Sequence, residues 1–249
     1  FPDNKWDELL DISANLVQIK STGGEPLLLE GFKKYIKKLV EKGYSKEIVF
    51  TTVTNGTVDC TDLLPYMNEF KEFRLRWSVD GTNSTYDYIR YPGNFNRMKR
   101  THERIANSYI RNNYKNIRIH IDPTIQLFNV HNIIELLKYA ESLEIINKVE
   151  MGYIYDEPEY LNAGLMPDNM LKEIFKKADD QMSSIKINNN YKNIKEIILS
   201  KQKSYNLKRK QELFKLTQSM VDYWKRVRKI DVRNHIATYD EIVNWYANK

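Results

Sequence analysis

Apolar and polar positions follow two alternating patterns between residues 16 and 154 of this chain. Short apolar, β-branched or aromatic runs predict five strands, at 16–20, 47–53, 73–79, 117–121 and 149–154. Apolar residues that recur every three or four positions predict a helix near 6–12, before the first strand, and helices near 32–40, 95–110 and 133–143 between or after strands. A short helix is expected near 62–67 and a loop over 83–93. Strands that alternate with helices favour right-handed βαβ units and a parallel sheet.

The pattern predicts an α/β protein with a barrel followed by a helical extension. We favour a barrel over a doubly wound sheet because no Gly-x-Gly-x-x-Gly follows a strand. A helix with Pro167 at its start is the last of the repeating units, and two or three helices follow the polar stretch 188–193. We therefore expect a partial βα barrel over 1–184 and a basic helical C-terminal extension over 185–249.

Two details of the extension are predicted as well. The longest helix should pack one face into the core, and Thr238-x-x-Glu241 should form a capping box at the start of the last helix. The apolar face of the longest helix consists of Leu213, Phe214, Thr217, Met220, Val221, Trp224 and Val227.

Composition and charge narrow the class of protein. The 249 residues are 41% hydrophobic, which suffices for a sizeable core, and no apolar run is long enough to span a membrane. The net charge is +6, and residues 186–233 hold fourteen Lys and Arg against four Asp and Glu. This excess indicates either an acidic or nucleic-acid partner or simply a solvated face. A single cysteine, Cys60, fits a reducing, cytoplasmic compartment.

Several catalytic classes lack their motifs. The four histidines form no zinc pattern, and the chain contains neither a Gly-x-Ser-x-Gly elbow nor a P-loop. Chemistry is instead expected where the strands end, because parallel α/β folds build their sites at the carboxyl ends of the strands. Those ends are small or acidic: Ser21 to Glu25, Thr54 to Thr57, Ser78 to Gly81, Asp122-Pro123 and Asp156-Glu157.

Each of these motifs alone has an ordinary structural interpretation. Gly23-Gly24-Glu25-Pro26 could be a strand-to-helix turn, and Asn55-Gly56 a β-turn. Together and in this order, they resemble the core of radical S-adenosylmethionine (radical SAM) enzymes over residues 16–154. The segments that carry the resemblance are Gly23-Gly24-Glu25-Pro26, Thr54-Asn55-Gly56-Thr57, Trp77-Ser78-Val79-Asp80-Gly81 and Asp87-Tyr88-Ile89-Arg90. Residues 158–249 faintly resemble C-terminal extensions of the peptide-modifying (SPASM/twitch-like) branch.

The resemblance implies a partial (βα)₆ TIM-like barrel, here without its first strand, that binds S-adenosylmethionine across the strand ends. The segment Gly23-Gly24-Glu25-Pro26 would hold the methionyl amino group, which a carboxylate and backbone carbonyls can accept. The resemblance also implies that Ser78 lies near the ribose or carboxylate of the cofactor. Asn55 and Asp80 would line the same opening of the barrel at the strand ends. Arg90 would pair with a carboxylate of the cofactor or of a substrate.

The chain departs from the family in one respect. The family reduces its cofactor with a [4Fe–4S] cluster held by a Cys-x₃-Cys-x₂-Cys loop. This chain has only Cys60, which follows the second motif and cannot substitute for that loop. Because the chain begins at Phe1 without a methionine, we expect either truncation after the cluster loop or a cluster-less relative. In both cases these residues alone should not cleave the cofactor reductively, and the catalytic residues stay unknown.

The functional prediction has two versions. In the first, the chain is the core of a radical SAM enzyme whose substrate is a peptide or protein side chain, or else a nucleotide. This version implies an electron donor such as flavodoxin or ferredoxin. In the second, a cluster-less barrel is a non-catalytic binding module for an acidic partner or nucleic acid.

Overall fold

A computed structural model describes residues 3–154 and 157–249. The chain forms two compact units. Unit 1 comprises Phe1–Ser78, Arg97–Ile121 and Leu143–Lys148, and unit 2 comprises Val79–Asn96, Asp122–Ser142 and Val149–Lys249. Asp156, predicted at the end of the fifth strand, lies outside the described residues.

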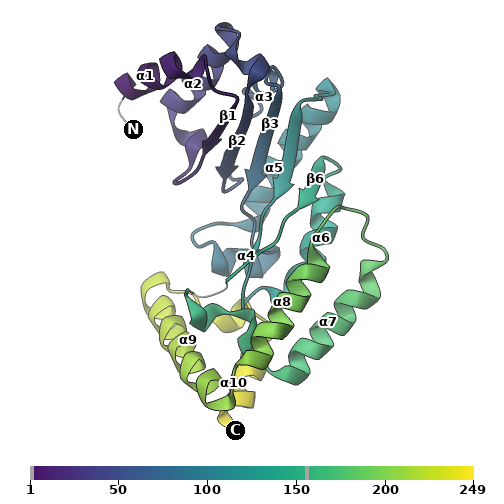
Figure 1. Ribbon diagram of the computed structural model, residues 1–249. Helices are drawn as coiled ribbons and strands as arrows, with labels where there is room; N and C mark the ends of the chain where they lie inside the picture. The colour runs from purple at the N-terminus through teal and green to yellow at the C-terminus, as the bar shows by residue number, and fades with distance from the viewer. Residues whose placement is uncertain (1–2, 155–156) are drawn as a thin grey trace. The chain divides into compact units, whose positions relative to one another are not determined.

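The five-stranded sheet belongs to unit 1, apart from its last residue, Val149. Its strand order is β1-β2-β3-β4-β6, and the pairs β1–β2, β2–β3 and β3–β4 are parallel (Figure 1). The strands are β1 (Gln18–Ser21), β2 (Val49–Thr54), β3 (Glu72–Trp77), β4 (Ile117–Ile121) and β6 (Ile146–Val149). The helices that alternate with them are α1 (Asp3–Ser13), η1 (Pro26–Leu28), α2 (Glu30–Glu41), η2 (Tyr44–Glu47), α3 (Leu64–Met67) and α5 (Phe95–Asn112), of which α5 begins in unit 2.

Alternation along the strands builds the core of unit 1. In β3, Phe73, Leu75 and Trp77 are buried, whereas the intervening residues are half-buried. The ring of Phe73 stacks on that of Phe50 in β2, with centroids 5.0 Å apart. Such a period of two gives one apolar and one polar face. The α/β class, the parallel sheet, the partial barrel-like form and the helical C-terminal part are thus as the sequence predicts.

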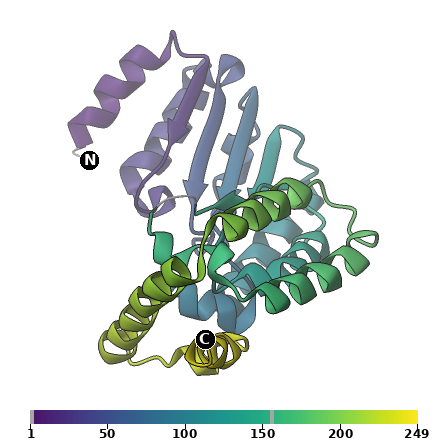
Figure 2. The ribbon, with the colours of Figure 1, turned by 60° about the horizontal axis from the view of Figure 1, so that its bottom comes forward.

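Unit 2 contains a small parallel sheet and most of the helices. Strand β5 (Thr124–Ile125) pairs with β7 (Gly152–Tyr153). Helices α7 (Asp168–Met182) and α8 (Tyr191–Ser204) lie side by side in both views (Figures 1 and 2), and Asp179 of α7 bonds to Tyr191 and Lys195 of α8. The helices are α4 (Asn83–Ile89), η3 (Val130–Asn132), α6 (Ile133–Ser142), η4 (Glu159–Leu161), η5 (Ala163–Leu165), α7 (Asp168–Met182), α8 (Tyr191–Ser204), α9 (Leu207–Arg228), η6 (Val232–Asn234) and α10 (Tyr239–Ala247). Among the described residues, no helix has both the length and the hydropathy of a membrane-spanning segment.

Two predicted elements are wrong. Residues 83–93 are not all loop, because α4 forms over Asn83–Ile89 and buries Thr85, Tyr86 and Tyr88. Tertiary burial here overrides the polar, turn-rich composition. The predicted strand 149–154 is instead divided between β6 and β7. The break falls at Met151, whose backbone N–H and C=O bond to the side chain of Asn190 rather than to a strand.

Of the two details predicted for the extension, the capping box is wrong and the apolar face of the longest helix is confirmed in part. Thr238 precedes α10, but its ψ of −4° is helical rather than extended, and its hydroxyl makes no capping bond. An N-cap side chain normally needs an extended backbone to reach the first turn. On α9, Leu213, Phe214, Thr217 and Val221 are buried as predicted, whereas Val227 is 56% exposed.

Candidate functional site

The segment after β1 turns sharply and leaves open space beside its backbone. Gly23 and Gly24 have φ values of +90° and +57°, and a Cβ atom on either would meet nothing within 4 Å. Only glycine adopts such angles without strain. Pro26 then starts η1 with φ preset for a helical turn. A hollow of about 350 Å³ lies along β1, where Ser21, Thr22 and Gly23 line it together with apolar residues of α1 and α2 that include Trp6 and Phe32.

Glu25 joins the ends of two neighbouring strands. One carboxylate oxygen accepts hydrogen bonds from the Thr54 hydroxyl at 2.7 Å and from the Leu27 amide at 3.3 Å. The other accepts a bond from the Asn55 amide at 2.7 Å. A carboxylate has about four acceptor positions, so three internal donors leave room for about one more. Glu25 therefore supports the fold of this edge and retains a limited capacity for a cationic ligand.

Asn55 and Ser78 lie at the adjoining strand ends. The Asn55 side chain accepts bonds from the backbone and hydroxyl of Thr57, which makes an Asx turn after β2. The Ser78 amide donates to the Thr54 carbonyl at 2.8 Å. Unit 1 therefore brings together six predicted residues: Gly23, Gly24, Glu25, Pro26, Asn55 and Ser78. Their predicted contacts with a cofactor stay predictions.

His102 lies behind this edge and was not singled out from the sequence. Its ring stacks on Trp77 with centroids 3.8 Å apart and is fully buried. Burial lowers the pKa of His102 to about 3, although a hydrogen bond with the Gly56 backbone opposes the shift. A Cβ on Gly56 would lie 2.5 Å from Nε2 of His102. The sequence signal was its place in the apolar stripe of α5, four residues after Met98 and three before Ile105.

The other two predicted residues, Asp80 and Arg90, lie in unit 2 and pair with each other. The Arg90 guanidinium is 2.6 Å from the Asp80 carboxylate, and the Asp80 side chain is 7% exposed. Asp80 also accepts a bond from the Thr124 amide at 2.7 Å. A buried carboxylate with these partners is well compensated. Whether Arg90 also binds a cofactor or substrate carboxylate stays a prediction.

The residues of this chain do not fit an iron–sulfur cluster. Cluster irons need several thiolates, and the one cysteine, Cys60, is buried. Burial raises the pKa of Cys60 to about 12, which keeps the thiol protonated. No group of three or more His, Cys, Asp or Glu side chains that could hold a metal occurs among the residues that the structure describes.

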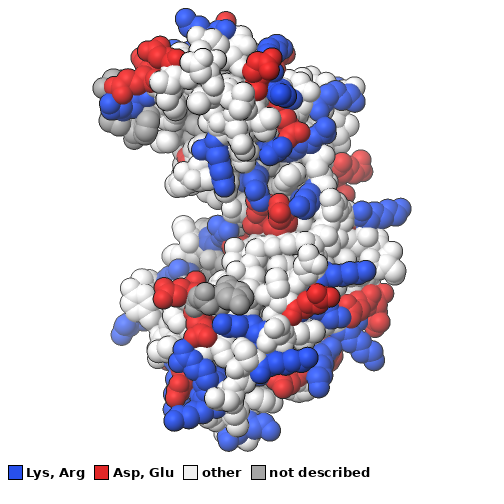
Figure 3. All heavy atoms as spheres, in the orientation of Figure 1, with Lys and Arg blue, Asp and Glu red and all other residues white. Residues whose placement is uncertain are grey.

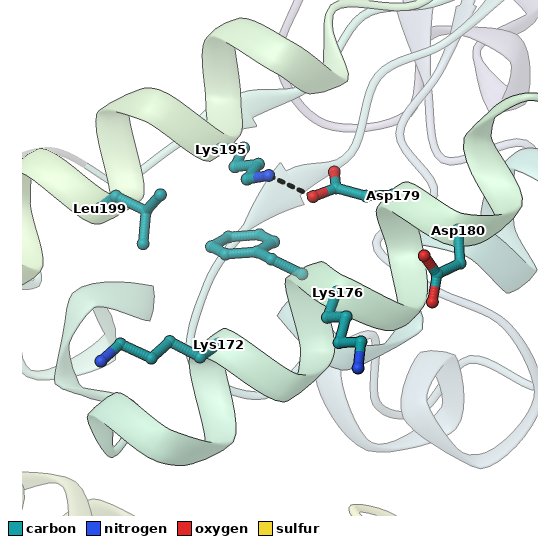
Figure 4. A pocket seen from close by; sticks show the side chains of 7 residues that line it. Lys172, Lys176, Asp179, Asp180, Lys195 and Leu199 are labelled. Carbon is teal, nitrogen blue, oxygen red and sulfur yellow. Dashed lines mark hydrogen bonds and ion pairs between the residues drawn. The ribbon is translucent and has the colours of Figure 1, made fainter.

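Ion pairs with Asp and Glu compensate part of the excess positive charge of residues 186–233. Glu159 binds Arg209 at 2.5 Å, and Lys195 packs against Phe175 beside its bond to Asp179 (Figure 4). Further pairs include Lys201–Glu159, Arg209–Glu212, Lys210–Asp168, Lys225–Asp231, Arg233–Asp231 and Arg233–Asp240. Much of this charge therefore has an internal structural role.

Comparisons with known proteins identify a shared fold. No protein-family model matches the sequence, and no curated protein matches it. Solved structures with a similar fold include those of radical SAM enzymes, so the fold is that of their partial barrels. This chain covers only about half of their length.

Three of these structures are particularly informative. SuiB of Streptococcus suis bound to S-adenosylmethionine is 13% identical, with a TM-score of 0.53 over 76% of this chain and 43% of SuiB. SuiB bound to the precursor peptide SuiA is 14% identical, with a TM-score of 0.53 over 76% and 42%. Native anSMEcpe with bound AdoMet is 19% identical, with a TM-score of 0.55 over 76% and 55%. At these identities the similarity establishes the fold alone.

Proposed function

We propose that this chain is the S-adenosylmethionine-binding part of a radical SAM enzyme of the peptide-modifying branch. The fold shared with SuiB and anSMEcpe supports this proposal, as do the peptide and S-adenosylmethionine named in those structures. The substrate would be a peptide or protein side chain, and a donor such as flavodoxin or ferredoxin would supply electrons. We further propose that the barrel part extends over 1–184 and the basic extension over 185–249.

The open Gly23-Gly24 turn is the observation that carries the proposal. Its left-handed backbone lies beside unfilled space, and Glu25 ties it to the end of β2. The methionyl ammonium would bind the remaining acceptor position of Glu25 and nearby backbone carbonyls, since charge-assisted bonds favour a carboxylate. Asn55 and Ser78 would line the same edge. Asp80 and Arg90, in unit 2, are the remaining members of the proposed set.

The proposal for these residues is confined to binding. When bound, S-adenosylmethionine supplies the radical chemistry of the family. Since Cys60 and its surroundings do not fit a cluster, none of the roles proposed for these residues depends on one. The contribution of this chain is to hold the cofactor by its amino group and to keep the strand-end backbone in the conformation that leaves room for it.

A pair of glycine substitutions tests the proposal. Gly24 and Gly43 both have positive φ and open space where a Cβ would lie, so alanine strains each similarly, by about 1 kcal/mol. Only Gly24 lies at the proposed site. Titration calorimetry should show saturable binding of S-adenosylmethionine to the wild type, weakened at least about tenfold by Gly24→Ala and unchanged by Gly43→Ala. No saturable binding to the wild type, or equal effects of both changes, would contradict the proposal.

A further inference from the structure

One face of the sheet in unit 1 carries charged side chains. All-parallel sheets usually have apolar residues on both faces because helices cover both. In β3, Phe73, Leu75 and Trp77 pack into the core, while Glu72, Arg74 and Arg76 point to the opposite face and are half-buried. Figure 3 shows blue side chains gathered over the strands of this sheet.

Three of the cations lie in a single row across four strands. The pairing register places Lys20 beside Thr51, Thr51 beside Arg74, and Arg74 beside Arg118. Because neighbouring strands are about 4.8 Å apart, this row spans about 14 Å. The Arg74 and Arg118 side chains are 41% and 47% exposed, and Lys20 is exposed too. We call Lys20, Arg74 and Arg118 the basic row.

Glu72 compensates the basic row only in part. Its carboxylate lies 2.5 Å from Arg74 and 3.9 Å from Arg118. One carboxylate between two guanidiniums leaves an excess of positive charge, and the described residues give Lys20 no ion pair. Arginine binds carboxylates through two parallel N–H bonds, so part of each fork can serve another acceptor.

The basic row lies close to the proposed S-adenosylmethionine site. Gly23 follows Lys20 by three residues, which corresponds to about 10 Å of extended chain. A peptide that reached the strand ends could therefore place a neighbouring segment on the row. Val49 and Val53 lie on the same face beside Thr51 and are half-buried, so they offer apolar contacts between the cations.

We propose that the basic row binds an acidic segment of a peptide substrate through its Asp and Glu carboxylates. This inference rests on the proposed function and adds the chemical class of its substrate. A peptide fits better than a single-stranded nucleic acid, which binds largely by stacking bases on aromatic rings. In β1 to β4, all of whose residues the structure describes, Phe50, Phe73 and Trp77 belong to the buried face, which leaves half-buried His120 as the one aromatic ring on the charged face.

Fluorescence anisotropy with the full chain can test this. The probe is a labelled peptide of about ten residues with alternating Glu and Ala, long enough to cross the row. The wild type should bind it, and Arg74→Gln with Arg118→Gln should weaken binding at least about tenfold. Arg100→Gln with Arg111→Gln is the matched control, because both are exposed arginines of α5. It removes the same charge and should change binding less than about twofold.

A third variant predicts a change in the opposite direction. Glu72→Gln removes the competing carboxylate, so the acidic peptide should bind more tightly by about threefold or more. Circular dichroism would check that each variant is folded. The proposal is overturned if the wild type does not bind, if the control pair weakens binding equally, or if Glu72→Gln weakens it. It is also overturned if a Lys-Ala peptide or a single-stranded DNA of equal length binds better.

The two proposals fail separately. Binding of the acidic peptide requires no cofactor, so it can be measured whether or not S-adenosylmethionine binds. Loss of cofactor binding in Gly24→Ala with peptide binding intact separates the two sites. Peptide binding by a wild type that fails to bind S-adenosylmethionine would contradict the proposed function and leave an acidic-peptide site.

Discussion

The Thr54 hydroxyl donates a 2.7 Å hydrogen bond to the Glu25 carboxylate, 29 positions away in sequence. With the bond from the Asn55 amide, it fixes the end of β1 against the end of β2. The carboxylate of Glu25 in the Gly-Gly-Glu-Pro segment therefore has a structural role: it connects two strand ends of the protein. A ligand that binds at this edge contacts a backbone whose position the hydrogen bonds of Glu25 already fix.

Glu25→Ala should lower the free energy of unfolding by about 2 kcal/mol, because three bonds to the carboxylate are lost and the Asn55 and Leu27 amides are left without this acceptor. Urea denaturation measures this change. Glu30→Ala is the control, since Glu30 pairs only with Lys33 on the surface of α2 and should matter far less. Equal losses in the two variants would mean that the strand-end bonds contribute nothing particular.

Gly56→Ala should destabilise the protein more than Gly43→Ala. The two residues have nearly the same φ, +72° and +76°, so the backbone strain of alanine is common to both. Only at Gly56 would the new Cβ meet the buried His102 ring, 2.5 Å away. Forcing that ring aside should add about 1–3 kcal/mol to the loss. The difference between the two melting curves isolates this contact, and no difference would refute it.

The alternation of apolar and polar residues and the motifs at the strand ends are the features that allowed elements to be predicted from the sequence. Strand 117–121 was predicted with the bounds that it has, because Ile117, Ile119 and Ile121 alternate with polar residues. The strands around Phe50 and Phe73 were placed within two residues from their apolar, β-branched or aromatic runs. The grouping of Glu25 with Asn55 followed from parallel topology, which puts carboxyl ends at one edge.

Features that depend on contacts between segments far apart in the chain could not be predicted from the sequence. The basic row exists because the register aligns Arg74 with Arg118, and register is not encoded in either strand alone. The break at Met151 depends on Asn190, 39 positions later. Val227 fits the helical period of α9 yet is exposed. The period predicts which face of a helix is apolar, but it does not predict over what length other elements cover that face.

Arg90→Met should lower the stability of unit 2 by about 3 kcal/mol. The change keeps most of the aliphatic side chain but leaves the Asp80 carboxylate, 7% exposed, with only the Thr124 amide as a partner. Arg233→Met is the control, because Arg233 pairs with Asp240, whose side chain is 60% exposed. Denaturation followed by Trp fluorescence should separate the variants. A small loss in Arg90→Met would show that Asp80 does not depend on Arg90.

Stability should fall on mild acidification because of His102. Burial lowers the pKa of His102 to about 3 in the folded state, from an ordinary value of 6.5. Between these pKa values His102 binds a proton in the unfolded chain but not in the folded chain. The contribution of neutral His102 to the free energy of unfolding is therefore present above pH 6.5 and is lost progressively as the pH falls. It should amount to about 1.5 kcal/mol between pH 6.5 and pH 5. Denaturation at both pH values should show this loss in the wild type and a smaller one in His102→Gln. An unchanged pH dependence in His102→Gln would assign the loss to other groups.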